Sequence, residues 1–184
     1  TSIGGNVTLN AGNTAGDYAE IFTYEYGTTI GGNVSLTGNY GYLYTYDYGD
    51  LTIAGNVAVK LSTTNDGEAN IYTDDLGDVR IGGNVTMTGG NGDDDLEVYT
   101  SNVHGNININ GVLTMNGGAG DDYMGVYTDD YETSLLTSGI HMNGGAGDDY
   151  GVVSAYYDDL TVQGWVVMNG GSGNDRLGLA AASE

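Results

Sequence analysis

Four glycine-rich turns that carry acidic residues are the parts of this sequence best suited to chemistry. Two of them read NGGAGDDY, at 116–123 and 143–150, and looser copies lie at 89–95 and 169–176. Their glycines can adopt positive φ, and one or two carboxylates follow at the exit of each turn. Oxygens from carboxylates and turn carbonyls suit Ca²⁺, which takes roughly six to eight of them in flexible geometry. The turns therefore predict an edge of the molecule that binds cations.

The acidic residues of the four turns fall into two adjacent columns when the turns are aligned. Carboxylates repeated at a strand spacing of ~4.8 Å repel, by about 1 kcal/mol per pair in water and roughly 3 kcal/mol at an effective dielectric near 20. A cation held between successive turns would convert this cost into stabilisation, whereas solvated turns without metal are the simpler interpretation. The predicted metal site contains Asp93, Asp94, Gly118, Gly120, Asp121, Asp122, Gly145, Gly147, Asp148, Asp149, Gly171, Gly173, Asn174 and Asp175. A second and less regular acidic corner, for which metal binding stays open, contains Glu25, Asp47, Asp75, Asn102 and Asp130.

Short strands with one buried face are expected to position these turns. Apolar residues alternate with polar ones in 81–88 and again in 96–100, which is the period of a half-buried strand, and no helical period is sustained. The openings IGGNVTL, IGGNVSL, IAGNVAV and IGGNVTM recur along the chain. Repeats of this length predict an all-β parallel β-solenoid (β-helix) in one domain, with about seven coils of 23–28 residues. The coils are expected near 3–29, 30–52, 53–80, 81–108, 109–135, 136–161 and 162–184, beginning at Ile3, Ile30, Ile53, Ile81, Ile109, Leu136 and Val162.

A single coil cannot bury its apolar face, so stacking is expected to build one continuous interior. One predicted inner column contains Val7, Val34, Val57 and Val85. The column beside it contains Leu9, Leu36, Val59, Met87, Met115, Met142 and Met168.

The segments GGNGDDDLE (89–97), GGAGDDYMG (117–125), GGAGDDYGV (144–152) and GGSGNDRLG (170–178) resemble the RTX, or haemolysin-type, calcium-binding nonapeptide. The resemblance implies secretion, and calcium held between coils by turn carbonyls and the sixth-position aspartates. Those aspartates are Asp94, Asp122, Asp149 and Asp175, while Leu96, Met124 and Leu177 match the inward apolar position and Gly151 departs from it. RTX motifs recur about every nine residues. Here one motif comes about every 26 to 28 residues, and coils one to three lack it.

An aromatic column is predicted on the outer face of the strand that follows each acidic turn. Such a column stabilises a sheet by cross-strand packing, and an exposed one also offers a face to a partner chain or a sugar. The residues assigned to partner binding or assembly are Phe22, Tyr24, Tyr44, Tyr46, Tyr72, Tyr99 and Tyr127. On the first strand, the outward Asn-x-Ser/Thr segments beginning at Asn6, Asn33 and Asn84 are either glycosylation sites or an amide ladder.

Composition restricts the function further. With 25 acidic against three basic residues the net charge is −22, which argues against nucleic acid and anionic membranes as partners. No run of membrane-spanning length is present, so no membrane insertion is expected, and the lack of cysteine fits an extracellular protein. The aspartates follow the repeat, whereas a catalytic site would break it, so no enzyme is expected.

These observations predict a secreted, calcium-binding structural β-solenoid. Its expected role is that of a self-assembling filament or surface-layer subunit, or of a segment used in cell adhesion, with partners that are copies of itself stacked head to tail or a surface polysaccharide. The alternative is a carbohydrate-binding module that uses the tyrosine column. An ice-binding protein is less favoured because the outward column Thr8, Ser35, Ala58, Thr86, Thr114 is imperfect, and a polysaccharide-degrading enzyme is less favoured because no acid–base pair breaks the symmetry.

Overall fold

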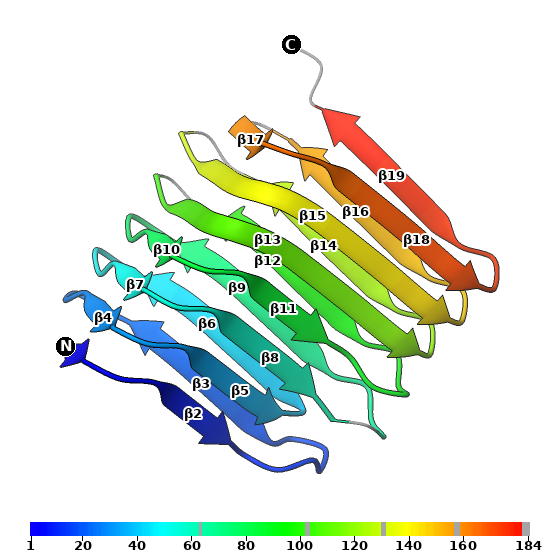
Figure 1. The fold of residues 1–184 in the computed structure, drawn as a ribbon, viewed down its shortest axis with the longest axis horizontal. Coiled ribbons are helices and arrows are strands. Elements are labelled where there is room, and N and C mark those ends of the chain that lie inside the picture. The colour runs from blue at the N-terminus through cyan, green and yellow to red at the C-terminus, as the bar shows by residue number, and fades with distance from the viewer. Residues whose placement is uncertain (63, 102–103, 130–131, 157–158, 182–184) are drawn as a thin grey trace.

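The chain is a parallel β-solenoid in which two sheets face each other (Figure 1). A computed structural model describes residues 1–62, 64–101, 104–129, 132–156 and 159–181. No helix occurs among these residues, and hence none that could cross a membrane. Sheet A contains β1 (Ser2–Ile3), β2 (Val7–Asn10), β4 (Thr28–Ile30), β5 (Val34–Gly38), β7 (Leu51–Ile53), β8 (Val57–Leu61), β10 (Val79–Ile81), β11 (Val85–Thr88), β13 (Asn106–Ala119), β15 (Ser134–Ala146), β17 (Asp159–Val162) and β18 (Val166–Ser172). Sheet B contains β3 (Tyr18–Thr23), β6 (Tyr40–Tyr46), β9 (Glu68–Asp74), β12 (Asp95–Ser101), β14 (Tyr123–Thr128), β16 (Tyr150–Ala155) and β19 (Arg176–Ala181).

Each strand pairs in parallel with its equivalents in the preceding and following coils. In sheet B, β12 lies between β9 and β14, with Leu96 opposite Ala69 and Met124. The seven strands of sheet B correspond to seven successive coils, so the path makes about six full turns. The predicted solenoid and its repeat length are therefore confirmed.

Sheet A changes along the stack. In the first four coils and the last, a short bend divides the strand in two, as between β4 and β5. In coils five and six the strand is continuous as β13 and β15, and its register shifts between Ile109 and Val112. This shift places Thr137 opposite Ile109 and Val162, so the expected start of coil six at Leu136 is wrong by one residue. The buried Thr137 is accommodated because its hydroxyl donates to the carbonyl oxygens of Gly111 and Gly139.

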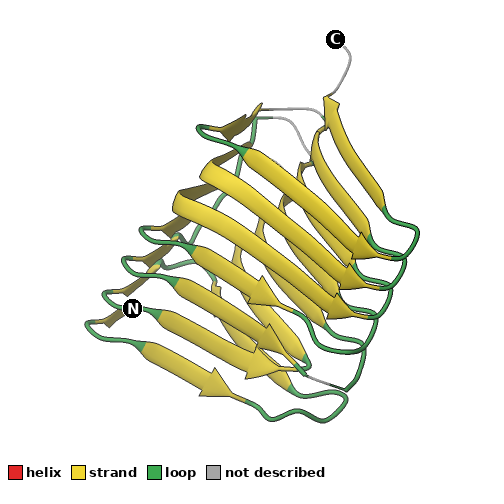
Figure 2. Cartoon of the chain, turned by 45° about the vertical axis from the view of Figure 1, so that its right-hand side comes forward, coloured by secondary structure: helices red, strands yellow, loops and turns green. Residues whose placement is uncertain are grey.

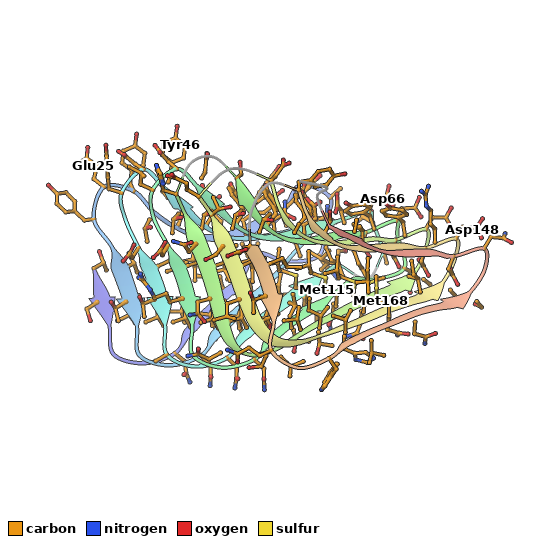
Figure 3. All side chains as sticks on the ribbon, turned by 90° about the horizontal axis from the view of Figure 1, so that it is seen from above. Glu25, Tyr46, Asp66, Met115, Asp148 and Met168 are labelled. Carbon is orange, nitrogen blue, oxygen red and sulfur yellow. The ribbon has the colours of Figure 1, made fainter. Side chains whose placement is uncertain are left out.

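The core is a thin apolar layer between the two sheets. Alternation along each strand sends every second side chain inward, as in β12, where Leu96, Val98 and Thr100 are buried. Met115 and Met168 lie between the sheets in Figure 3, and both expected inner columns are confirmed by the strand register. The space at Gly151 is occupied by its neighbours, since an added Cβ would meet Leu177 at 2.9 Å and Met168 at 3.1 Å.

An amide ladder runs along the bend of sheet A. The main-chain N–H of Asn33 donates to Asn6 Oδ1 at 2.8 Å, and Asn84 Oδ1 accepts from the N–H of Val112 at 2.9 Å. Asn33 and Asn56 make the same contact to the coil that follows each of them. The side-chain amides therefore extend the inter-coil hydrogen bonding where the strand is interrupted, which is the ladder interpretation of the Asn-x-Ser/Thr segments.

The first and last coils lie at opposite ends of the stack (Figure 2). At these ends the strand edges of β2 and β3, and of β18 and β19, each have a neighbour on one side only. Apolar side chains there stay accessible, with Ile3 and Leu177 each 40% exposed and Leu179 69% exposed.

Candidate metal site

The glycine-rich turns lie along one edge of the solenoid, where sheet A passes into sheet B. Asp66 and Asp148 mark this edge in Figure 3, and Glu25 and Tyr46 mark the opposite edge. We call the first of these the acidic edge, comprising the turns at 89–95, 116–123, 143–150 and 169–176.

Coils five, six and seven share one turn conformation. Gly118 and Gly120 have φ of 126°, a backbone state in which an L side chain is strained, and the matching glycines of coils six and seven also have positive φ. Gly92, at the equivalent position of coil four, is not in this conformation. The four motifs are thus similar in letters, but only three share this backbone geometry.

The sixth-position aspartates point inward along the acidic edge. Asp94, Asp122 and Asp149 are at most 2% exposed. In each case one carboxylate oxygen accepts from the main chain of the preceding coil. The N–H of Asp94 donates to Asp122 Oδ1 at 2.9 Å, that of Asp122 to Asp149 Oδ1 at 2.9 Å, and that of Asp149 to Asp175 Oδ1 at 3.1 Å. Gly67 continues the column, since its N–H donates to Asp94 Oδ1 at 2.9 Å.

The residues just before these aspartates form an outer column, in which the hydrogen bonds between coils run in the opposite direction. Here each carboxylate accepts from the coil that follows it. The N–H of Asp121 donates to Asp93 Oδ1, that of Asp148 to Asp121 Oδ1 and that of Asn174 to Asp148 Oδ1, each at 2.8 Å. The predicted pairs are therefore brought together at one edge, and much of their hydrogen-bonding capacity goes to inter-coil contacts.

Two buried carboxylate oxygens on the inner column have no hydrogen-bond partner. They are Oδ2 of Asp122 and Oδ2 of Asp149. In coil four the same atom of Asp94 accepts from the N–H of Gly90, so the difference follows the different turn conformation. A buried oxygen without a donor costs about 1–3 kcal/mol, which makes these two atoms the best candidates for holding a cation or a proton.

Each of the two orphaned oxygens converges with a carbonyl from the next coil. A Cβ built on Gly117 would lie 2.3 Å from Asp122 Oδ2 and 2.7 Å from the carbonyl oxygen of Gly144. A Cβ on Gly144 would lie 2.2 Å from Asp149 Oδ2 and 2.4 Å from the carbonyl oxygen of Gly170. The first glycine of the motif thus keeps open a space between coils toward which a carboxylate and a main-chain oxygen both point.

Electrostatics favour neutralisation of the inner column. Burial raises the pKa of Asp122 to about 7, against the lowering effect of the N–H of Asp94, and the charges of Asp94 and Asp149 raise it further. Burial is also the largest cause of the raised pKa of Asp94 and of Asp149. A cation close to these carboxylates would relieve the same desolvation and repulsion that favour their protonation.

The residues fit calcium in part. Orphaned carboxylate oxygens beside glycine carbonyls are the donor set that Ca²⁺ takes. No group of three or more Asp, Glu, His or Cys side chains that could hold a metal is found among the described residues. The protein therefore offers carboxylates from the stacked turns, and its remaining ligands would have to be main-chain oxygens. Of the predicted positions, those around Asp122 and Asp149 fit best, and the turn containing Asp93 and Asp94 fits least.

The second acidic corner is built differently. Asp47 and Asp75 have positive φ, 66° and 82°, and so act as turn formers without glycine. Asn102 and Asp130 lie outside the described residues. Its described residues show no paired columns of carboxylates like those of the acidic edge.

Sequence reasoning missed a group of acids on the outer face of sheet B. Burial raises the pKa of Asp95 to about 6 and that of Glu97 to about 7. The charge of Glu68 raises both pKa values further, and that of Asp95 also raises the pKa of Glu97. Tyr127 Oη donates to Glu97 Oε1 at 2.9 Å, and Tyr42 Oη donates to Glu68 Oε2 at 3.0 Å. The outward positions of these acids in β9 and β12, beside bulky tyrosines, were the available signal.

The predicted aromatic column is present on that same face. Tyr44, Tyr72, Tyr99 and Tyr127 stack in sequence, with centroids 4.8 to 5.2 Å apart and ring planes within 9° of parallel. Phe22 continues the stack at 5.4 Å from Tyr44, and Tyr24 stacks on Tyr46 at 5.2 Å. The four rings from Tyr44 to Tyr127 therefore serve cross-strand packing first, because they cover one another's faces, whereas Phe22, Tyr24 and Tyr46 stay 45% to 53% exposed.

Comparison of the chain with models of protein families, with curated sequences and with solved structures found no match. A functional proposal for this chain rests on its fold and on the geometry of its turns.

Proposed function

We propose that the chain is an extracellular structural β-solenoid, stabilised by calcium along its acidic edge, that stacks end to end into filaments or surface layers or serves as an adhesin segment. The role is non-catalytic, because its carboxylates follow the repeat. Extracellular placement is supported by the charge of −22 and the lack of cysteine, since external calcium would offset the excess charge.

The observation that carries the proposal is that, in the described part of the chain, the strands at both ends of the stack have a neighbour on one side only. Strand edges with unpaired N–H and C=O groups, next to accessible core side chains, favour addition of a further strand. If coil one of a second copy continued the register of coil seven, Ile21 of that copy would cover Leu179. A contact between unlike ends does not close on itself, so it propagates into a filament.

The position of Arg176 supports the same head-to-tail orientation of two copies. Its guanidinium lies over the ring of Tyr150, 5.5 Å from the centroid, on the outer face of the last coil. Continued register would place Tyr18 of the second copy on its other side. The arginine would then lie between two rings, a favourable arrangement for a cation.

Assembly is tested by sedimentation velocity and electron microscopy at increasing protein concentration, with calcium and with chelator. We expect filaments or elongated oligomers with calcium. Leu179→Glu should leave the monomer folded, since this side chain is already 69% exposed, yet it should abolish assembly by burying a charge opposite Ile21. Tyr48→Glu adds the same charge at a side chain that is 67% exposed in coil two, which forms neither end of the stack, and it should assemble normally. A monomer at all concentrations with calcium would contradict the proposal.

Calcium binding is tested separately by thermal unfolding and calorimetric titration. A ligand that binds only the folded state raises the melting temperature by mass action, so chelation should lower it. The double variant Asp122→Asn, Asp149→Asn keeps an acceptor for each inter-coil N–H but removes both charges. It should abolish the calcium response, which is the rise in melting temperature on adding calcium. Asp17→Asn, in a coil without the motif, is the matched control and should retain that response. A wild-type melting temperature that ignores both calcium and chelator at low salt would mean that protonation alone neutralises the column.

A further inference from the structure

The aromatic column of sheet B stops at Tyr127, although the sheet continues for two more strands. Tyr72, inside the column, has a ring on each face, Tyr44 at 4.8 Å and Tyr99 at 5.2 Å. Among the described residues, Tyr127 has a stacked ring on one face only, that of Tyr99, because the next residue in register is Ser154. Its second face is therefore the end of the stack.

A groove of about 250 Å³ lies where the next ring of the column would stand. Val152 and Ser154 form its floor, and Tyr127 borders it from the neighbouring strand. Tyr150 borders it at one end along the strand, and Tyr156 borders it at the other. The groove has the size of one six-membered ring with substituents, not that of an extended ligand.

The lining of this groove combines ring surface with hydroxyl groups. Tyr123 and Tyr150, stacked with centroids 5.4 Å apart, contribute one wall. Four tyrosines supply hydroxyls that can both donate and accept, Asp129 supplies one carboxylate, and Ser154 is buried at the floor. No basic residue is among the described residues that line the groove, Arg176 lies next to it over the ring of Tyr150, and the chain carries −22 overall. An uncharged, hydroxyl-rich ring suits these surroundings, whereas an anionic one would be repelled.

We propose that this groove is a binding site for one neutral pyranose unit of a polysaccharide, stacked on the free face of Tyr127. The apolar face of the sugar would replace the missing ring of the column, and its hydroxyls would exchange hydrogen bonds with the surrounding tyrosines and Asp129. The site is distinct from the acidic edge and from the ends of the stack, so it does not depend on calcium or on assembly.

The test is titration of the folded chain with neutral oligosaccharides of glucose, galactose and mannose, and with oligogalacturonate as the anionic counterpart. Binding is followed by calorimetry and by the ring resonances of ¹³C-labelled tyrosine. We expect at least one neutral oligosaccharide to bind and to shift Tyr127 and Tyr156, and oligogalacturonate to bind more weakly. Absence of binding by all neutral sugars, or stronger binding of oligogalacturonate, would overturn the proposal.

Variants locate the site within the column. Ser154→Tyr would place a ring where the sugar is proposed to lie, so it should abolish binding while extending the stack. Tyr127→Ala removes the stacking face and should weaken binding by about tenfold. Tyr127→Phe keeps that face and should bind within a few-fold of wild type.

Tyr72→Ala is the matched control, because it removes a ring of the same column whose faces are already covered. Its affinity should equal that of wild type, with folding of each variant checked by circular dichroism. Equal losses in Tyr72→Ala and Tyr127→Ala would place the sugar on the column as a whole and refute a site at its end. Unchanged binding by a folded Ser154→Tyr variant would refute it as well.

Discussion

The main-chain N–H of Asp94 donates to Oδ1 of Asp122 in the following coil, with nitrogen and oxygen 2.9 Å apart. The inner carboxylate therefore faces a backbone donor and not only the neighbouring carboxylate. On the outer column the direction is reversed, as in the donation from the N–H of Asp121 to Asp93 Oδ1 at 2.8 Å. Two antiparallel series of hydrogen bonds thus join the coils along an edge that charge repulsion alone would separate.

Removal of an inner carboxylate should cost more stability than removal of an outer one. Asp122→Ala leaves the N–H of Asp94 without its acceptor in a site where the side chain is 2% exposed. We expect a loss of about 1–3 kcal/mol in the free energy of unfolding. Asp121→Ala frees an exposed N–H that water can satisfy, so its loss should be below about 1 kcal/mol. Urea unfolding with chelator present measures the free energy of unfolding of both variants. Equal losses would show that the inner hydrogen bond does not stabilise the fold more than the outer one.

The first glycine of the motif should not tolerate a side chain. In Gly144→Ala the new Cβ would lie 2.2 Å from Asp149 Oδ2 and 2.4 Å from the carbonyl oxygen of Gly170, so the turn or the stacking must shift. We expect destabilisation of about 1–3 kcal/mol, together with weaker calcium affinity if calcium uses these oxygens. Gly178→Ala is the control, since no atom lies within 4 Å of its added Cβ. A fully stable Gly144→Ala variant would contradict the close convergence of these oxygens.

Loss of a central ring should destabilise the solenoid more than loss of an exposed one. Tyr72 lies between two stacked rings, whereas Tyr26 is 82% exposed. Tyr72→Ala should therefore lower the free energy of unfolding by about 1–3 kcal/mol, and Tyr26→Ala should change it by less than about 0.5 kcal/mol. Thermal and urea unfolding compare the two, and similar effects would mean that the column does not stabilise the sheet.

The repeat allowed much of the fold to be predicted, because equivalent residues in successive coils must lie in register. The inner methionine column and the stacked tyrosines follow directly from that alignment. The start of coil six could not be placed correctly, since a buried Thr137 satisfied by two carbonyls looks polar and therefore exposed in the sequence.

The residues of the candidate site could be predicted from the sequence, but their geometry could not. The letters GGxGxD do not tell which neighbouring coil a carboxylate bonds, and the inner and outer columns bond in opposite directions. The turn of coil four matches the motif yet lets Gly90 satisfy the second oxygen of Asp94, so the orphaned oxygens of the inner column are those of Asp122 and Asp149. These differences arise from the backbone dihedral angles of single glycines. Because glycine can adopt several backbone conformations, the motif letters do not determine which one a turn takes.

The acids on the outer face of sheet B should make stability depend on pH. Burial, followed by the charge of Asp95, raises the pKa of Glu97 from an ordinary value of 4.5 to about 7 in the folded chain. The folded state thus binds the proton more tightly than the unfolded state does. The stability that Glu97 contributes is fully present below about pH 4.5 and is lost as pH rises through about 7. The difference is on the order of 2 kcal/mol after allowance for partial exposure of the site.

Glu97→Gln should remove this dependence while keeping an acceptor for the hydroxyl of Tyr127. Urea unfolding of wild type and variant between pH 4.5 and 8, at constant salt and with chelator, isolates the contribution of Glu97 from that of the other carboxylates. The variant should gain stability relative to wild type as the pH rises, with most of the change complete near pH 7. Glu20→Gln, at an exposed side chain in the same outward column of sheet B, is the control and should follow wild type throughout. A difference between wild type and Glu97→Gln that stays constant across this range would mean that Glu97 is ionised in the folded chain at every pH tested.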